Sequence, residues 1–385
     1  MKVIFTLGSP KIGGGTNVIF EHASFIANQG NEVYIVNENK IYKKDYKWHS
    51  KAQVLKFVTY DEIKNMTFDV AIATWWLTVY NLFKIKAKDY LYFVQSIESK
   101  FYKDNEKQFQ MLAELTYCLD LKIITEATWI KTYLENNYSL KVKLVLNGIR
   151  KDIFKVIKNL KGHNGLRVLI EGPIDVDFKN VPNTIKLAKK SNANEIWLLT
   201  SSDIKSFKGV DRVFSRIPPK DCAKVYNQCD VIVKLSYVEG MFGPPLEMFH
   251  CGGTAIVYDV SGHDEYVKNG YNGIVIKSGN EKEVILAINS LTDKKKLNQY
   301  KVNALKTASK WDSWEKSSNN FYKAIIELIK NNPVNYDALK HKSKLFYKIF
   351  EEYNNKHESL YTVFGRSIKR RVPFLYNILK KIRDK

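Results

Sequence analysis

Cysteine is scarce in this sequence, which has 385 residues and only four cysteines. They are Cys118, Cys222, Cys229 and Cys251, and no two of them have the spacing of a metal site or a redox pair. A chain of this length needs no disulfides to hold its core, so we interpret all four as reduced packing residues. Acids and histidines also show no metal-ligand spacing, so we expect no metal and no cofactor.

Long hydrophobic runs are missing as well. The longest uncharged apolar stretch, from Val70 to Phe83, is interrupted by polar residues. It is shorter than the roughly 20 residues that a membrane-spanning helix needs. The N-terminal run Val3–Leu7 is followed at once by Gly8, which suits a first strand better than a secretion signal. These features predict a cytoplasmic protein.

Negative charge is in deficit, with 40 acidic residues against 61 lysines and arginines and a formal net charge of +21. Such a protein is attracted to anions, and nucleic acid and anionic lipid are the two candidates. The lysines are scattered, and there is no zinc-finger, RNA-recognition or helix-turn-helix signature. We therefore expect no nucleic-acid partner.

The length exceeds the usual domain of about 100–200 residues, so two domains are expected. Apolar runs predict strands at 1–7, 33–36, 55–58, 70–73, 91–94, 122–124 and 143–146, and then at 166–170, 195–199, 211–214, 230–235, 254–258 and 273–276. A helix predicted at 18–28 makes the start a β-α-β unit. The fold class is therefore α/β, with two doubly wound parallel sheets.

The most informative stretch runs from Ser236 to Gly253, where a buried strand turns into a helix that begins near Pro244. Glycines in the turn let the backbone approach a ligand, and the first helical turn leaves N–H groups unpaired, which favours phosphate. Glu239 and Glu247 bracket this turn and would repel a phosphate unless they bind neighbouring hydroxyls. A nucleotide sugar has such hydroxyls on both sides of its diphosphate.

The pattern Glu, seven residues, Glu, enclosing Gly-x-Phe-Gly-Pro, resembles the donor motif of retaining family-4 glycosyltransferases of the GT-B fold. Further blocks resemble the same family in the same order: the glycine loop 13–15, the Asn147-Gly148 segment, and residues 261–273. Together these cover roughly the first 330 residues.

The resemblance implies transfer of a sugar from a nucleotide sugar to a glycan or lipid-linked acceptor, with the donor as co-substrate. Glu239 and Lys179 would be catalytic. The implied donor-binding set is Gly14, Gly15, Gly172, Lys179, Arg216, Glu239, Gly240, Met241, Phe242, Gly243, Pro244 and Glu247. The implied acceptor-binding set is Thr16, Gln95, Ser96 and Glu98.

The sequence departs from the family at two places. Where the family has Gly-Arg and a following lysine for the diphosphate, this chain has Gly172-Pro173 and Lys179, so the arginine is missing. We hypothesise that Arg216 supplies that charge, and the alternative is a solvated surface arginine. Gln95 and Ser96 stand where many members have a histidine. Gln95 and Glu98 followed by Phe101-Tyr102 are similar to a branch of bacterial surface-glycan rhamnosyltransferases.

Several alternatives stay open. Glu247 alone reads as a first-turn residue that stabilises the helix dipole, and the glycine loop 13–15 as a tight turn. Gln95 and Glu98 can serve loop hydrogen bonds, and the two glutamates could be a glycosidase pair. A nicotinamide site is disfavoured because the glycine spacing is wrong and the second strand ends at Asn37. A GT-B sugar-nucleotide epimerase and a non-catalytic glycan- or partner-binding protein also remain.

The predicted domains are residues 1–154 for the acceptor, a lysine-rich linker at 155–165, and 166–318 for the nucleotide sugar. A helix at 319–335 would cross back to the first domain. Residues 336–385 form a basic tail, with apolar residues from Ile368 to Ile382 at helical spacing among lysines and arginines. This predicts peripheral attachment to the anionic inner face of the cell membrane. The alternative is a helix that packs on the body.

Overall fold

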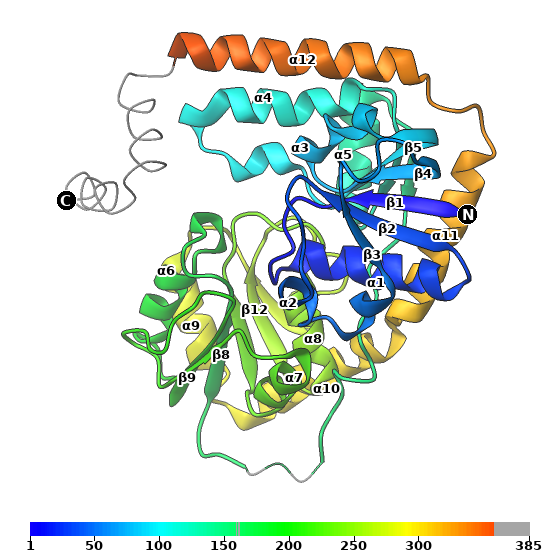
Figure 1. The fold of residues 1–385 in the computed structure, drawn as a ribbon. Helices are drawn as coiled ribbons and strands as arrows, with labels where there is room; N and C mark the ends of the chain where they lie inside the picture. The colour runs from blue at the N-terminus through cyan, green and yellow to red at the C-terminus, as the bar shows by residue number, and fades with distance from the viewer. Residues whose placement is uncertain (159, 161, 358–385) are drawn as a thin grey trace.

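The structure is a computed structural model that describes residues 1–158, 160 and 162–357. The described chain forms two parallel sheets, each covered by helices on both faces, and the two sheet domains face each other (Figure 1). This is the doubly wound α/β architecture predicted from the sequence.

The first sheet has seven strands in the order β3-β2-β1-β4-β5-β6-β7. Their bounds are β1 Lys2–Thr6, β2 Glu32–Asn37, β3 Lys56–Thr59, β4 Thr67–Ala73, β5 Lys86–Val94, β6 Lys122–Thr125 and β7 Val142–Leu144. Every neighbouring pair is parallel. The central strands are apolar and buried on both faces, as expected for a parallel sheet between helical layers.

Five helices belong to this domain's own sequence: α1 Gly14–Asn28, α2 Lys43–Tyr46, α3 Trp76–Val79, α4 Lys107–Leu115 and α5 Thr128–Tyr138. Helix α1 begins at Gly14, four residues before the predicted start at Val18. The extra turn is polar and rich in glycine, so the apolar periodicity that marks a helix does not reach it. Gly13 precedes the helix in an extended conformation, and no side chain caps the end.

The second sheet has six strands in the order β10-β9-β8-β11-β12-β13. Their bounds are β8 Arg167–Glu171, β9 Glu195–Thr200, β10 Arg212–Ser215, β11 Val231–Lys234, β12 Thr254–Tyr258 and β13 Gly273–Ile276. The helices are α6 Val181–Ala188, α7 Pro219–Asn227, α8 Gly243–His250, α9 Glu281–Ser290 and α10 Lys294–Lys310. All the strands predicted from apolar runs are present: those at 254–258 and 273–276 have the predicted bounds, and the ends of the others are shifted.

The chain crosses between the domains twice, and the two crossings lie side by side. The outgoing chain passes Ile149, whose N–H donates to the carbonyl of Asp312 at 3.1 Å. The N–H of Trp314 donates to the carbonyl of Ile149 at 3.3 Å, where helix α11 (Trp314–Ile329) begins its return. A Cβ on Gly148 would lie 2.3 Å from the nitrogen of Trp314, so only glycine allows this approach.

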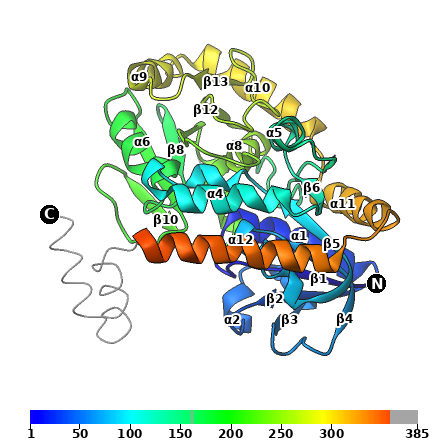
Figure 2. The same cartoon turned by 90° about the horizontal axis from the view of Figure 1, so that it is seen from above.

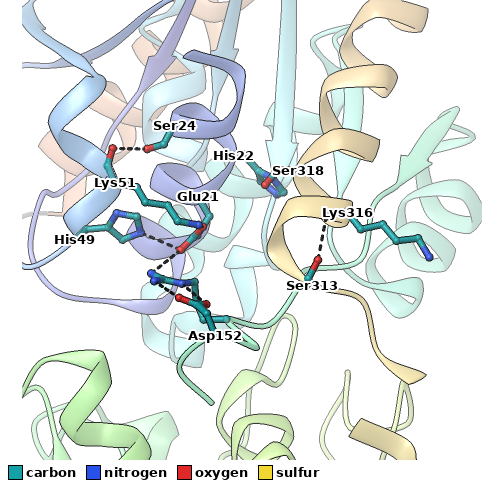
Figure 3. A network of polar contacts seen from close by, with 10 residues as sticks. Glu21, His22, Ser24, His49, Lys51, Asp152, Ser313, Lys316 and Ser318 are labelled. Atoms are coloured by element: carbon teal, nitrogen blue, oxygen red, sulfur yellow. Dashed lines mark hydrogen bonds and ion pairs between the residues drawn. The ribbon is translucent and has the colours of Figure 1, made fainter. Parts of the chain in front are cut away.

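Helix α11 packs on α1, and a polar network supports this contact (Figure 3). His22 of α1 is fully buried, stacks on Phe321 with 4.1 Å between ring centroids, and shares a 3.0 Å hydrogen bond with Ser318. Next to it, the buried Glu21 accepts from Lys51 at 2.7 Å and lies 3.4 Å from the guanidinium of Arg150. The network therefore ties the first helix to both crossings.

Helix α12 (Tyr336–His357) lies along α4 on the first domain (Figures 1 and 2). Leu339 is buried in that contact. The predicted amphipathic pattern from Ile368 to Ile382 lies outside the described residues. In the part of the chain that is described, no helix is long and apolar enough to cross a membrane.

Candidate active site

The turn from β11 into α8 lies at the carboxyl edge of the second sheet, where open α/β sheets bind ligands. Helix α8 begins at Gly243 and has Pro244 in its first turn, where a missing N–H costs nothing. Phe242 is buried and anchors the turn in the core. The strand-to-helix geometry predicted for this motif is confirmed.

Four charged side chains gather beside this turn. The carboxylate of Glu239 lies 2.8 Å from the ammonium of Lys179 and 3.7 Å from that of Lys234. Lys234 also contacts Glu171, at 2.5 Å to its carboxylate and 3.2 Å to its backbone carbonyl. Gly172 follows with φ +140°, and a Cβ there would lie 3.7 Å from the Lys234 nitrogen. The structure therefore brings Glu239, Lys179 and Gly172 together as predicted.

Burial and charge set the ionisation of this group. Burial by itself would raise the pKa of Glu239, but Lys179 and Lys234 lower it below the usual value. Burial opposes the charge of Lys234, yet Glu171 and Glu239 raise its pKa. Glu239 and Lys234 are therefore a charged pair at neutral pH.

Glu247 behaves differently. Burial raises its pKa to about 8, and the nearby Glu171 carboxylate adds to the effect. The hydroxyl of Tyr226 lies close enough to oppose part of this rise. At neutral pH Glu247 is therefore mostly protonated.

The first domain reaches the same turn through the segment after β6. The carboxylate of Glu126 accepts from the backbone N–H of Met241 at 3.2 Å, and the indole of Trp129 donates to the carbonyl of Gly240 at 3.0 Å. Glu126 is buried, which raises its pKa to about 7, and Asn147 lies within hydrogen-bonding range of it. Among the described residues, its second oxygen has no partner.

A second contact between the domains lies beside Lys179. The rings of Phe101 and Phe178 stack with centroids 5.0 Å apart, and Lys103 forms a 2.6 Å ion pair with Asp177. The segment that carries Lys179 is therefore held against the first domain.

The residues predicted to bind the acceptor do not all lie in one place. Thr16 donates to the carbonyl of Ser9 at 3.0 Å near the start of α1. Gln95 lies at the domain boundary, because a Cβ on Gly240 of the second domain would be 2.1 Å from its backbone oxygen. Its side-chain oxygen lies beside the start of α1, 3.2 Å from the position of a Cβ on Gly15. Within the described residues, that oxygen and the buried hydroxyl of Ser96 have no partner.

Glu98 lies inside the first domain. Its carboxylate accepts from the backbone N–H of Trp76 at 2.6 Å and from the hydroxyl of Tyr92 at 3.1 Å. Burial raises its pKa to about 8. This arrangement matches the alternative of loop hydrogen bonding.

Arg216 is not brought into the charged group. Its guanidinium donates to the carbonyl of Ser201 at 3.0 Å and forms a 2.9 Å ion pair with Asp203. Half of its side chain is exposed. The interactions of Arg216 in this structure are therefore those of a surface residue.

Sequence reasoning missed three members of the site: Lys234, Glu171 and Glu126. Each lies at or just after the carboxyl end of a predicted strand. A charged residue at or after the end of an apolar run could have indicated these three positions, because ligands bind at the carboxyl ends of the strands. In the chain covered by the structure, no three histidines, cysteines or acids gather as a metal site.

Comparison with known proteins shows which proteins this chain resembles. Residues 150–307 match the family model described as "Glycosyl transferases group 1". An uncharacterized glycosyltransferase of Methanocaldococcus jannaschii is 26% identical over 215 residues, which cover 51% of this chain and 56% of that protein. The alignment thus spans little more than half of the relative.

Solved structures share the whole fold. Sucrose-phosphate synthase from Thermosynechococcus elongatus has a TM-score of 0.69 at 15% identity, over 86% of this chain and 100% of that one. Anabaena HepE, solved in complex with UDP-glucose, has a TM-score of 0.71 at 14% identity, over 85% and 100%. At these identities the likeness establishes the fold alone. The chain therefore has the GT-B fold, and residues 150–307 of its second domain are similar to the group 1 glycosyl transferases.

Proposed function

We propose that this protein is a retaining glycosyltransferase of the hexosyl-transferring type. It would move a sugar from a nucleotide sugar to a glycan or lipid-linked acceptor. The observation that carries the proposal is the ion pair of the buried Glu239 with the partly exposed Lys179, beside the helix start at Gly243 and facing the first domain. This geometry offers carboxylate, ammonium and backbone N–H groups within one small region, and a nucleotide sugar needs all three.

Each group has a role in donor binding. Glu239 would accept hydrogen bonds from hydroxyls of the donor sugar, and Glu247 from the ribose. Lys179 would stabilise the diphosphate as it gains charge in the transition state. The N–H groups of Met241 and Gly243 would join it by leaving their present acceptors, the Glu126 carboxylate and the Met241 carbonyl. The first turn of α1, at Gly14 and Gly15, would approach the donor from the first domain.

The reaction requires one bond to form as another breaks. An acceptor hydroxyl oxygen bonds to the anomeric carbon while the bond from that carbon to the phosphate oxygen breaks. Attack on the face from which the phosphate leaves retains the configuration, and the departing phosphate oxygen takes the acceptor proton. The contacts of Glu126 and Trp129 with the donor turn favour exclusion of water, which would otherwise hydrolyse the donor.

A role in surface polysaccharide assembly is part of the proposal. One structure with the same fold, at 14% identity and a TM-score of 0.66, is WaaG, a glycosyltransferase involved in lipopolysaccharide biosynthesis. The basic tail at 336–385 would attach the protein to the anionic inner face of the membrane. Deletion of 366–385 should then reduce sedimentation with anionic liposomes, and unchanged sedimentation would refute this attachment.

The direct test is to incubate the protein with a panel of nucleotide sugars, with and without membrane lipid extract, and to measure nucleoside diphosphate release. The proposal predicts release that depends on an acceptor and is lost in Glu239→Gln. Acceptor-independent release of nucleotide would indicate an epimerase. No turnover with any donor would indicate a non-catalytic binding protein.

A further inference from the structure

Lys234 and Glu171 form the least expected pair of the charged group. They are the last residues of β11 and β8, which are neighbouring parallel strands. The side chain of Lys234 is only 3% exposed, and its ammonium is within 2.5 Å of Glu171 and 3.7 Å of Glu239. A buried lysine at the ligand edge of a sheet carries a high desolvation cost, so its charge calls for an explanation.

The position of this lysine fits a diphosphate. Lys234 lies between Glu239, on the side of the donor sugar, and Glu171, whose charge acts on Glu247 on the ribose side. In a nucleotide sugar the diphosphate joins the ribose to the sugar. The neighbouring backbone includes Gly172, where the absence of a Cβ leaves room beside the lysine nitrogen.

The balance of charge leads to the same residue. Glu171 and Glu239 offset Lys179 and Lys234, so the group is close to neutral before an anion arrives. A diphosphate placed here needs two cations to be stabilised. Arg216 is engaged by Asp203, which leaves Lys234 as the cation beside Lys179 within this group.

On the basis of the proposed function, we infer that Lys234 is the second cation for the donor diphosphate and that Glu171 regulates its availability. When the diphosphate binds, the ammonium of Lys234 turns from the Glu171 carboxylate toward a phosphate oxygen. Glu171 therefore lowers affinity for the diphosphate, although it lies in the binding site. A merely structural ion pair would not have this effect.

The test measures binding by titration calorimetry on the full chain. UDP, GDP, ADP and dTDP are first screened, and the tightest diphosphate is then compared with its monophosphate. Lys234→Met should weaken diphosphate binding by roughly tenfold to a hundredfold and monophosphate binding much less. Lys234→Arg should recover part of the loss. Glu171→Gln should tighten diphosphate binding by several-fold, since the lysine is no longer neutralised.

Matched controls come from the opposite edge of the same sheet. Glu195→Gln breaks a pair with Arg167, and Lys301→Met breaks a pair with Asp230; neither should change diphosphate affinity. Lys234→Met leaves buried carboxylates without their cation, and a melting curve shows whether this variant still folds. The double variant Lys234→Met with Glu171→Gln removes the pair together, and it should fold and still bind the diphosphate weakly.

The outcomes separate this inference from the proposed function. If the wild type binds a diphosphate and turns over a donor, but the double variant binds equally well, Lys234 is not a phosphate ligand and the enzyme assignment stands. Weaker binding in Glu171→Gln would overturn the regulatory role of Glu171. If the wild type binds no diphosphate and releases none from any donor, the proposed function and this inference fail together.

Discussion

The α-carbon of Gly240 faces the backbone carbonyl of Gln95 across the domain boundary, and a Cβ at residue 240 would lie 2.1 Å from that oxygen. Gly240 belongs to the turn proposed to bind the donor, and Gln95 directly follows strand β5 of the first domain. The closed arrangement of the domains therefore depends on a missing side chain.

Gly240→Ala should open the domains, because a contact of 2.1 Å with backbone is relieved only by movement of the domains or the turn. We expect a larger radius of gyration in small-angle X-ray scattering of the free protein. Gly243→Ala is the matched control in the same turn, since a Cβ there meets no atom within 4 Å. Identical scattering from both variants would show that this contact does not hold the domains closed.

Lys179→Met should weaken diphosphate binding by roughly tenfold to a hundredfold, since it removes a charge-assisted contact next to Glu239. Arg216→Ala should change it less than threefold, about 0.6 kcal/mol, because Arg216 is paired with Asp203. Titration calorimetry with the same diphosphate compares the two. A larger loss in Arg216→Ala would restore the role proposed for that arginine from the sequence.

His22 should make the fold sensitive to mild acid. Burial lowers the pKa of His22 to about 3. Between this value and about 6.5, the imidazole is protonated in the unfolded chain and neutral in the folded chain. Stability therefore falls as pH drops below about 6.5, by about 2 kcal/mol at pH 5. In His22→Phe the contribution of this residue should be absent and the slope of stability with pH smaller, while the lost Ser318 hydrogen bond adds a constant offset. Urea unfolding at pH 7, 6 and 5 measures the free energy of unfolding of each variant. His341→Gln, which changes an exposed histidine, is the control.

Glu98 should have the opposite effect. Its pKa is raised to about 8, so the folded chain holds a proton that the unfolded chain has released above about 4.5. Stability contributed by this residue is fully present below pH 4.5 and is lost as pH rises through about 8, by about 5 kcal/mol in all. Glu98→Gln keeps an acceptor for Trp76 and should be more stable than the wild type at pH 8.5. Exposed Glu315→Gln should show no such gain.

Glu247 should make donor binding depend on pH. Burial raises its pKa to about 8, and only the ionised carboxylate accepts hydrogen bonds from both ribose hydroxyls. Affinity for the nucleoside diphosphate should therefore rise between pH 7 and 9. Calorimetry of Glu247→Gln, which cannot ionise, should give a flatter profile. If affinity depends on pH equally in the wild type and in Glu247→Gln, Glu247 does not bind the ribose.

Most of the fold was predictable because the strands of a parallel sheet are buried on both faces. Each therefore reads as a continuous apolar run, such as Val231–Val233, which the structure places inside the second sheet. The turn after this strand was equally predictable, because two glycines and two prolines mark a strand-to-helix turn. The start of α1 at Gly14 was not, because its first residues bear no apolar pattern.

The site residues were predictable only where they belong to one local motif or to a pattern of the resembled family. Glu239 and Glu247 share one motif, and Lys179 was found through a family pattern. Glu171 and Glu126 join them through strand order and the approach of the other domain, which no local pattern reports. The partner of Arg216 was missed for the same reason.

The paired crossings at Ile149 and Trp314 constrain how the molecule works. A rigid body attached at two neighbouring points turns about the axis through them, and sliding or free rotation is suppressed. Any swing of the lobes must then be widest far from this seam. Substrate would then enter and product would leave through the same opening of the cleft. A substitution at Gly148 would alter the opening of the domains without contacting the donor or the acceptor.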